Sequence, residues 1–263
     1  MIPEAPFTAS IVSHGQLRLV NALIADLIQH AGPQLKRLVV TLNIPEDEPI
    51  AGNGASFEII TIRNQRARGF GANHNRAFRH CNTDCFAVLN PDLRLFDDAL
   101  GLLLAQFRPD DGLIAPLILN PDGSPADAAR RVPTPFRLAT RLLRKAARGP
   151  DRDFDWLAGM CLMVNSKAFR ALGGFDERYH LYCEDIDLCL RMRLAGWRVR
   201  RVTQAKLVHE AQRASRRSLD YLRWHAQSLL RLWMSPVYWS YLRRRGELAS
   251  LRQTPSRSAH GPI

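Results

Sequence analysis

The sequence predicts an α/β fold, with one large domain built on a mostly parallel central sheet and with amphipathic helices at its C-terminal end. Short apolar runs alternate with segments of helical periodicity over residues 7–119, which is typical of strands joined by crossover helices. The 263 residues, 46% of them hydrophobic, suffice for one such domain and a small appendage. Beyond residue 212 the chain becomes rich in arginine and keeps only a helical pattern. We therefore expect a domain over residues 1–212 and a basic helical extension over residues 213–263.

In the alternating part, strands are predicted where apolar runs end in polar or turn residues, and helices where apolar residues recur every three or four positions. In chain order we expect a strand, a helix, two strands, a helix, a strand, a helix and a strand, at residues 7–14, 17–30, 35–43, 57–64, 71–80, 85–89, 97–107 and 112–119. Ligands of such sheets bind at the carboxyl ends of the strands. Polar clusters fall at three of those ends, at Ser13-His14, Asn43 and Asn90-Pro91-Asp92.

The second half of the chain is expected to begin with a surface loop, because residues 120–134 contain several Pro, Asp and Gly residues. A basic helix, a buried strand, a short helix stopped by two glycines, a longer helix and a last strand should follow, at residues 137–148, 156–164, 168–172, 184–195 and 197–202. Two arginine-rich amphipathic helices are predicted at 218–233 and 237–248, before a frayed tail beyond Gln253.

The net charge of +12 is concentrated at the C-terminal end, since the chain from Arg191 onward holds sixteen Lys or Arg residues and three Asp or Glu residues. Such asymmetry indicates a polyanionic partner: a membrane surface, a nucleic acid or a phosphate-bearing substrate. We see no signal peptide and no apolar run near the ~18 residues that a membrane span needs, so a cytoplasmic protein is expected. The five cysteines lack a zinc-binding spacing, and we expect reduced, buried thiols.

Two acidic clusters could carry chemistry. Asp92 ends an apolar strand, and a carboxylate there suits Mg²⁺ or Mn²⁺, although Asn, Pro and Asp are also ordinary turn residues. The second cluster surrounds the start of a predicted helix and consists of Asp176, Glu184, Asp185 and Asp187. The helix dipole favours acids at this position, but capping needs only one or two of them. One carboxylate of the Glu-Asp pair is therefore equally open to a role as a general base.

Residues 64–77, NQRARGFGANHNRA, combine glycines that permit a tight turn with side-chain amides near a helix start. Such a stretch could hold the polar groups of a nucleotide. It matches neither GxGxxG nor the phosphate loop that ends in Gly-Lys-Ser/Thr, and a lone glycine-rich loop is a weak signal. His209 follows a β-like apolar run, where a single histidine is either structural or a ligand.

Taken in order, these pieces resemble glycosyltransferase family 2, and within it the bacterial rhamnosyltransferase-like branch. The resembling segments are IVSHG at 11–15, the stretch from Asn64 with GFGANHNRA, LNPD ending at Asp92, WLAGMCLMVNSKAF at 156–169, GGFDERYHLYCEDIDLCLRMRLAGW at 173–197, and His209. They extend over residues 8–210, about three quarters of the chain. The order of the pieces is specific, whereas each short piece alone is not.

The resemblance implies a GT-A fold, in which a Rossmann-like nucleotide-binding half joins an acceptor-binding half, and it implies an inverting mechanism. Asp185 matches the base that deprotonates the acceptor hydroxyl. Asp92 matches a ligand of a divalent cation, Mg²⁺ or Mn²⁺, with His209 as a second contact. Nucleotide-binding roles are implied for Ser13, Asn43, Asn64, Gly71, Asn75 and Asn90. Acceptor-binding roles are implied for Trp156, Gly159 and Glu184.

The chain departs from the family pattern at three points. The family commonly opens with Val-Thr-Tyr-Asn, where this chain has VSHG at 12–15. The second strand of the family commonly ends in Asp-Asn, whereas here it ends at Asn43, so the usual acidic contact to the base is missing. Asn90 stands at the first Asp of the metal motif. Metal binding is therefore expected to depend on Asp92, His209, water and the donor diphosphate.

The expected function is transfer of rhamnose from dTDP-rhamnose to a lipid-linked or glycan precursor of a bacterial surface polysaccharide such as O-antigen. A UDP- or GDP-sugar donor is the alternative within the family. A nucleic-acid-binding protein would explain the basic C-terminal quarter, but no recognisable module is visible and we expect no nucleic-acid partner. A nucleotidyltransferase would need a Gly-rich, Arg- or Lys-containing loop after the first strand, which this chain lacks.

The two C-terminal helices combine Trp and Tyr with many arginines, which is typical of a helix at the headgroup level of an anionic membrane. We therefore expect peripheral attachment to the inner leaflet of the cytoplasmic membrane. The alternative is that their apolar faces pack on the catalytic domain while the arginines remain solvated.

Overall fold

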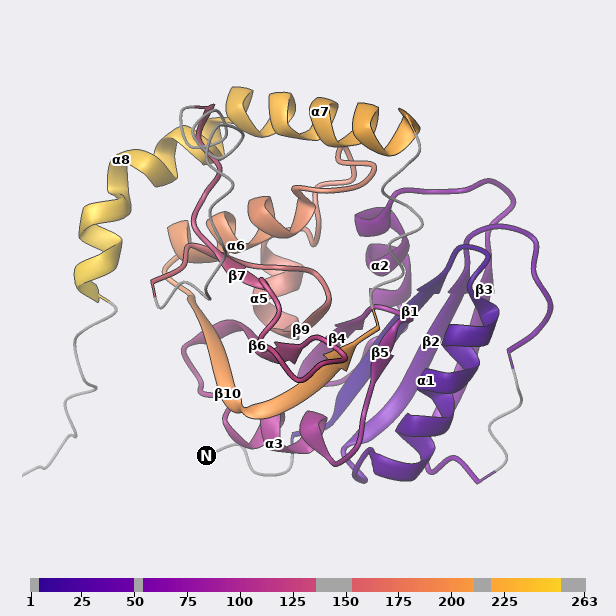
Figure 1. The fold of residues 1–263 in the computed structure, drawn as a ribbon. Helices are drawn as coiled ribbons and strands as arrows, with labels where there is room; N and C mark the ends of the chain where they lie inside the picture. Colours follow the sequence, from indigo (N-terminus) through magenta and orange to yellow (C-terminus); the bar gives the residue numbers. More distant parts are fainter. Residues whose placement is uncertain (1–4, 50–53, 136–152, 211–218, 252–263) are drawn as a thin grey trace, which may run out of the picture.

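The computed structural model describes residues 5–49, 54–135, 153–210 and 219–251. The helix expected at 137–148 and the tail beyond Gln253 lie outside these ranges. An eight-stranded sheet forms the centre, in the order β3-β2-β1-β4-β9-β6-β10-β5 (Figure 1). Its strands are β1 Phe7–Ser13, β2 Leu35–Leu42, β3 Glu58–Arg63, β4 Cys85–Leu89, β5 Leu93–Arg94, β6 Asp111–Leu119, β9 Cys161–Asn165 and β10 Arg198–His209.

The first four strands of that order are parallel, and so are β6 and β10. β9 runs antiparallel to both of its neighbours, and β5 runs antiparallel to β10. In β4, Cys85, Ala87 and Leu89 point into one core while Phe86 and Val88 point into another. Because side chains alternate between the two faces of a strand, a strand buried on both faces is apolar throughout. This is why β4 is a continuous apolar run in the sequence.

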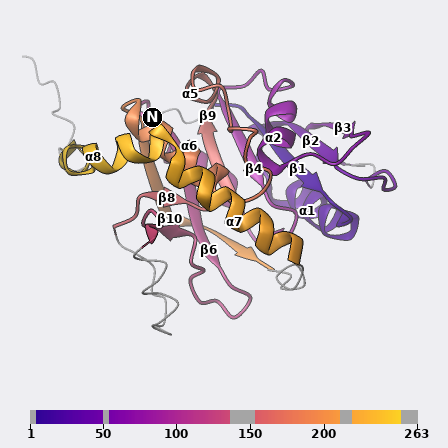
Figure 2. The ribbon, with the colours of Figure 1, turned by 90° about the horizontal axis from the view of Figure 1, so that it is seen from above.

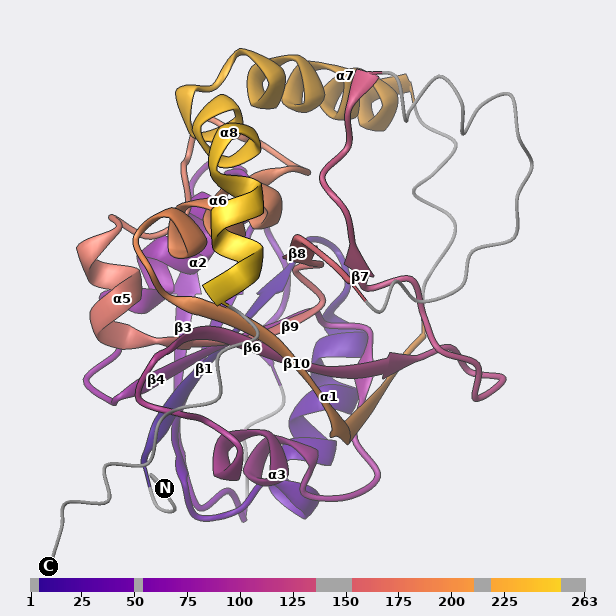
Figure 3. The ribbon, with the colours of Figure 1, turned by 90° about the vertical axis from the view of Figure 1, so that its left-hand side faces the viewer.

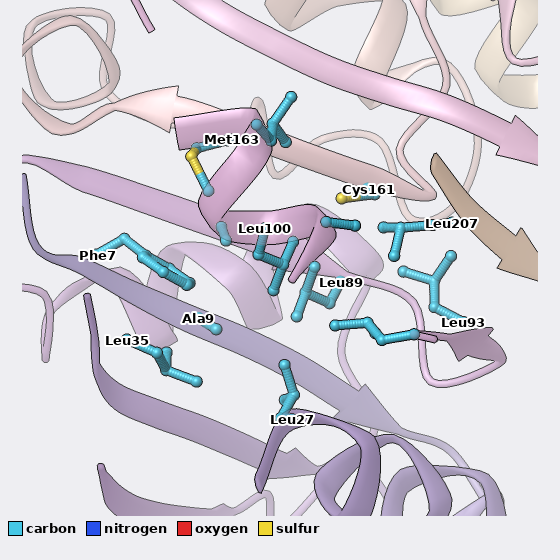
Figure 4. Packing of buried hydrophobic residues seen from close by; sticks show 14 of the residues in the cluster. Phe7, Ala9, Leu27, Leu35, Leu89, Leu93, Leu100, Cys161, Met163 and Leu207 are labelled. Atoms are coloured by element: carbon cyan, nitrogen blue, oxygen red, sulfur yellow. The ribbon is translucent and has the colours of Figure 1, made fainter. Parts of the chain in front are cut away.

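Helices cover both faces of the sheet (Figures 1 and 3). They are α1 Leu17–His30, α2 Phe70–Phe78, α3 Ala99–Ala105, α5 Ser166–Ala171, α6 Glu184–Leu194, α7 Leu219–Met234 and α8 Pro236–Leu251. α1 and α3 complete the first core, where Leu27 and Leu100 pack with strand residues such as Leu89 (Figure 4). The other helices surround the second core, which includes Phe169 and Leu190. The predicted α/β architecture is therefore confirmed.

The run at 156–164 was expected to form one strand, and this expectation is wrong. It forms two short strands, since β8, Trp156–Leu157, pairs with β7, Ala129–Arg130, before β9 begins. The break falls where the backbone N–H of Gly159 donates to the carboxylate of Asp185 at 2.9 Å instead of joining a ladder. A contact with a distant residue thus interrupts a segment that is apolar along its whole length. β7 lies within residues 120–134, where only a surface loop was expected.

The last strand, expected to end at residue 202, continues to His209. After a register shift between Val202 and Lys206, β10 pairs with β6 again. Its end also pairs with β5, where His209 lies opposite Leu93. β5 has only two residues, so no periodicity could indicate it. The extension brings His209 beside the polar end of β4.

In Figure 1, α7 lies along the top of the molecule and α8 descends at the left, and Figure 2 shows both helices from above. One side of the pair belongs to the second core, where Leu232, Tyr238 and Tyr241 are fully buried. The Tyr241 hydroxyl donates to the carboxylate of the buried Asp155 at 2.8 Å, and Arg245 pairs with the same carboxylate at 3.1 Å. The described part of the extension is therefore packed on the sheet domain, while the proposed boundary at 212 falls outside the described residues.

The opposite side of these helices keeps large apolar side chains in solvent. Leu222, Leu230 and Met234 are 69%, 55% and 68% exposed, and Trp239 is 53% exposed. Within the described residues, no helix is both long enough and apolar enough to cross a membrane. The five cysteines are buried and unpaired, as expected from their spacing.

Candidate active site

The carboxyl ends of β1, β2 and β4 meet at one edge of the sheet. The register aligns Ser13 with Leu42 and Ile11 with Leu89. Ser13, Asn43 and the turn that starts at Asn90 therefore lie along a single edge, as the sequence predicted. This is the edge at which ligands bind in open α/β sheets.

Three buried asparagines link this edge to the start of α2. The Asn43 carbonyl oxygen accepts from the Asn64 amide at 2.8 Å and from the backbone N–H of Arg68 at 2.8 Å. Asn64 also donates to Asn73 at 2.7 Å, and its own oxygen accepts from Arg76. Because these amide groups already have partners, they fix the loop ahead of α2. A direct contact of Asn43 or Asn64 with a nucleotide stays a prediction.

The Ser13 hydroxyl donates to the carboxylate of Glu46 at 2.8 Å. The same carboxylate accepts from the backbone N–H groups of Gly15 at 2.9 Å and Leu17 at 3.1 Å, where α1 begins. A carboxylate is favoured at this end of a helix, because unpaired N–H groups and the helix dipole attract it. Glu46 thus supplies an acid at the strand ends, where the acidic residue common at the end of the family's second strand is missing. This role of Glu46 was not predicted, because Glu46 follows β2 in the sequence, far from the start of α1 that it caps.

Gly71 and Asn75 hold α2 against the turn that precedes α6. A Cβ atom on Gly71 would lie 2.7 Å from the Cβ of Phe175, so only glycine allows this approach. Asn75 accepts from the Phe175 N–H at 2.8 Å and donates to the Phe175 carbonyl at 2.9 Å. Gly173 and Gly174, with φ of +74° and +73°, form the turn itself. Nucleotide contacts of Gly71 and Asn75 stay predictions beside these packing roles.

Asp92 and His209 come together at the other end of this edge. The Asp92 Oδ1 and His209 Nε2 atoms lie 3.0 Å apart, and both side chains are mostly buried. The contact is an ion pair only when His209 is protonated, and neither atom has a hydrogen-bond partner within the described residues. Two unsatisfied buried ligand atoms that face each other fit a bound cation, because burying polar atoms without partners is costly. Asn90 lies beside them, and its N–H donates to the Met160 carbonyl at 2.9 Å.

No cluster of three His, Cys, Asp or Glu side chains suited to a metal occurs within the described ranges. A cation at Asp92 and His209 would therefore need further oxygen ligands. Mg²⁺ commonly binds through one or two protein carboxylates together with substrate phosphates and water. The pair is thus suited to a metal that binds together with a diphosphate.

The second acidic cluster divides by its contacts. Asp187 pairs with Arg191 at 2.7 Å and Asp176 pairs with Arg178 at 2.7 Å, which gives both acids structural partners. Two non-glycine residues with positive φ, Tyr182 at 71° and Cys183 at 68°, immediately precede the remaining pair, Glu184 and Asp185. Such a backbone is strained and persists only where the surroundings impose it. It sets the direction in which α6 presents its first two carboxyl groups.

Asp185 accepts from the backbone N–H of Gly159 at 2.9 Å and from that of Ile186 at 2.8 Å. Burial raises the pKa of Asp185, although these hydrogen bonds and the positive charge of Arg130 oppose the increase. Glu184 is more deeply buried, and its Oε2 atom has no hydrogen-bond partner in the described part of the chain. Burial and the neighbouring Asp185 charge raise the pKa of Glu184 well above its usual value. Asp185 is thus the more accessible carboxyl group of the pair, and its role as the base stays a prediction.

Arg130 lies near enough to Asp185 for its charge to act on it, and it stacks on Trp156. The Arg130 guanidinium lies 5.4 Å from the centroid of the Trp156 ring, and the Trp156 indole N–H donates to the Arg131 carbonyl at 3.2 Å. Trp156 is only 7% exposed, so contact with an acceptor sugar stays a prediction. Arg130 was not singled out from the sequence, because it stands in an arginine-rich chain without a motif. Its charge acts on Asp185 and on His225 of α7.

The sequence matches known proteins over most of its length. Residues 47–170 match Glycosyl transferase family 2, and residues 144–247 match Glycosyl transferase family group 2. The rhamnosyltransferase WbbL of Escherichia coli K12 is 31% identical, over 84% of this chain and 90% of its own. An N-acetylglucosaminyl-diphospho-decaprenol L-rhamnosyltransferase of Mycobacterium tuberculosis is 28% identical, over 83% of this chain and 87% of its own.

The fold is similar to that of a solved mannosyltransferase from Pyrobaculum calidifontis, determined with GDP-Man and Mn²⁺. The TM-score is 0.59 at 14% identity, and the match covers 95% of this chain and 79% of that one. The expected GT-A fold is thereby confirmed. With a GT-A sheet, an acidic pair at the start of α6 and relatives that match most of its length, this chain belongs to glycosyltransferase family 2 and is a glycosyltransferase.

Proposed function

We propose that this protein transfers L-rhamnose from dTDP-rhamnose, with inversion, to a lipid-linked precursor of a bacterial surface glycan. The observation that supports the proposal is a chain of contacts between the two acidic positions: the Gly159 N–H donates to Asp185, and the adjacent Met160 carbonyl accepts from the N–H of Asn90, two residues before Asp92. Two relatives that match most of the chain are named rhamnosyltransferases, and one of these names specifies a sugar-diphosphate lipid. Membership of the family favours this activity over nucleic-acid binding and nucleotidyl transfer.

In the proposed reaction, Asp185 takes the proton of the acceptor hydroxyl, and that oxygen attacks the anomeric carbon of the donor. The bond from this carbon to the diphosphate oxygen breaks on the opposite side. The nucleoside diphosphate leaves with the bonding electrons, and the anomeric configuration inverts. Asp92 and His209 would hold Mg²⁺ or Mn²⁺, which neutralises the charge that develops on the diphosphate. The Pyrobaculum mannosyltransferase was solved in complex with Mn²⁺, which supports this choice of ions.

We further propose that the protein attaches to the cytoplasmic face of an anionic membrane through α7. Leu222, Ala226, Leu230 and Met234 recur at every fourth position of this helix, and all four are exposed. Arg223 and Arg231 follow two of these positions and are exposed as well. An apolar stripe flanked by arginines suits the boundary between headgroups and acyl chains, where a lipid-linked acceptor would lie.

The donor can be identified by incubating the purified protein with a panel of nucleotide sugars and measuring release of the nucleoside diphosphate. We expect dTDP-rhamnose to be consumed fastest, and only in the presence of Mg²⁺ or Mn²⁺. Faster release from a UDP- or GDP-hexose would contradict the proposed donor. Equal rates in EDTA would contradict the metal requirement.

A further inference from the structure

A cavity of about 430 Å³ lies between α7 and the turn at 176–182, which precedes α6. Arg178 and His180 line it from the turn, and Trp224, Leu230, Arg231 and Met234 line it from the helix. The two walls are held together, since the rings of His180 and Trp224 lie 4.8 Å apart and the Ser228 hydroxyl donates to the Leu181 carbonyl at 2.8 Å. The cavity is therefore part of the fold rather than a gap beside a loose helix.

The polar part of this cavity is cationic. Arg178 binds Asp176 through Nε and Nη2, so one carboxylate offsets part of its charge. Arg231 is exposed and forms no hydrogen bond or ion pair with the residues that the structure describes. Two guanidinium groups at one cavity suit a group with several charged oxygens, and phosphate is the best match to their geometry.

The apolar part of the cavity continues onto the surface. Leu230 and Met234 line the cavity and also belong to the exposed stripe of α7. A ligand that only carried phosphate would leave these side chains without a partner. A phosphate attached to a long apolar chain would satisfy both parts, because its chain could lie along the stripe.

The cavity is also connected through the chain to the proposed catalytic residues. The turn that forms one wall leads through Tyr182 and Cys183 directly into Glu184 and Asp185. The backbone carbonyl of His180 in the same turn accepts from the Phe70 N–H at 2.9 Å, at the start of α2. Figures 1 and 3 show α7 above both α2 and α6. The Asp92–His209 pair, by contrast, lies at the end of β10, where the donor diphosphate is expected.

We infer that this cavity binds the phosphate of the lipid-linked acceptor, with the lipid chain along the α7 stripe and the sugar directed to Asp185. This inference rests on the proposed function, since it assigns the acceptor side of the same reaction. It gives Arg178 and Arg231 a defined role and explains why a cationic cavity opens onto an apolar surface.

Calorimetry with farnesyl diphosphate as the probe tests the inference without turnover. The titrations are made in EDTA, so that a metal-dependent diphosphate site does not contribute. We expect Arg231→Gln to weaken binding about tenfold or more, the usual effect of losing a hydrogen bond to a charged group. Arg243→Gln is the matched control, because it removes the same charge from an exposed position of α8, outside both the cavity and the α7 stripe. Equal affinity of the two variants would overturn the assignment.

Two further probes separate the parts of the ligand. Inorganic pyrophosphate and farnesol should each bind more weakly than farnesyl diphosphate, and farnesol should be insensitive to Arg231→Gln. Pyrophosphate that binds as tightly as farnesyl diphosphate would overturn the role of the stripe. A wild-type protein that binds farnesyl diphosphate through Arg231 but transfers no rhamnose would contradict the proposed function and leave the cavity assignment standing.

Discussion

The carboxylate of Asp185 is held in place by two backbone N–H groups, and among the residues that the structure describes no cationic side chain lies at hydrogen-bond distance from it. Its neighbours in the same acidic cluster differ from it. Asp187 pairs with Arg191, and Glu184 is buried with one oxygen that has no hydrogen-bond partner in the described part of the chain. A fixed carboxylate without a strong ion pair keeps its basicity, which a general base requires.

Asp185→Asn should therefore lower turnover by roughly 10²–10⁴-fold, the range that general-base catalysis supplies, while donor binding changes little. Asp187→Asn is the control, because it removes an acid from the same helix turn and breaks the ion pair with Arg191. It should reduce the free energy of unfolding and leave turnover nearly unchanged. Steady-state kinetics and urea denaturation of both variants check this. Near-normal turnover of Asp185→Asn would move the role to another acid.

The activity should also depend on pH through Asp185. Its pKa is raised above the ordinary value of 3.8, chiefly by burial, and only the deprotonated form can accept a proton. Lowering the pH should thus reduce kcat/KM at a higher pH than an ordinary aspartate would require. For stability the sign is opposite, since a raised carboxyl pKa favours the fold at low pH and costs stability as pH rises through that pKa. An acid limb of kcat/KM at or below the ordinary value would contradict the assignment.

Asp92→Ala tests whether Asp92 and His209 hold a divalent cation. Loss of a charged ligand should weaken dTDP-sugar binding about 10–100-fold in Mn²⁺, by the usual energy of charged contacts. EDTA should weaken dTDP-sugar binding by the wild type to a similar extent and change binding by the variant little. Asp97→Ala is the matched control, because it removes the same charge from an exposed position nearby. Calorimetric titrations with and without EDTA measure all of these affinities. An unchanged affinity of the wild type for the dTDP-sugar in EDTA would exclude the metal role of Asp92.

At the scale of single elements, local periodicity was sufficient to predict the bounds of a helix or strand where the burial of its own faces determines those bounds. α1 and β4 have the expected bounds of 17–30 and 85–89, because one amphipathic face or two buried faces define them. The break at Gly159 and the extension of β10 depend on contacts with distant residues, and no local pattern contains them. The same holds for the site: Asp92 and Asp185 belong to recognisable pieces, whereas Glu46 and Arg130 become relevant only once the chain is folded.

The attachment of α8 leads to a prediction about one hydroxyl group. Tyr241 donates to Asp155, a fully buried carboxylate that also accepts from the Val132 N–H at 2.9 Å. Tyr241→Phe should lower the free energy of unfolding by about 1.5–3 kcal/mol, because the hydrogen bond is to a charged group. Tyr238→Phe is the control, since that hydroxyl donates at 3.3 Å to the neutral carbonyl of Pro133 and should cost less. Urea denaturation that finds equal losses would contradict the role of Asp155 in anchoring α8.

Across the whole molecule, charge and exposed apolar surface meet at one place. The positive excess of the chain comes from the residues after Arg191, and the stripe of α7 lies in the same region. Because α7 and α8 also bury Leu232, Tyr238 and Tyr241, removing everything after residue 212 would open the second core. Point substitutions on the exposed side separate membrane attachment from packing, which a truncation cannot do.

Leu222→Gln should weaken binding to anionic liposomes without changing stability. Leu222 is 69% exposed, so the fold gains little from its side chain, whereas burial of a leucine in lipid contributes about 1–2 kcal/mol when it is partly inserted. The matched control is Leu102→Gln on α3, which is 47% exposed and lies on the other face of the sheet. Co-sedimentation with anionic and neutral liposomes at low and high salt should show pelleting that needs anionic lipid, weakens with salt and falls only in Leu222→Gln. Equal loss in both variants, or recovery of the wild type in the supernatant throughout, would leave α7 with a packing role alone.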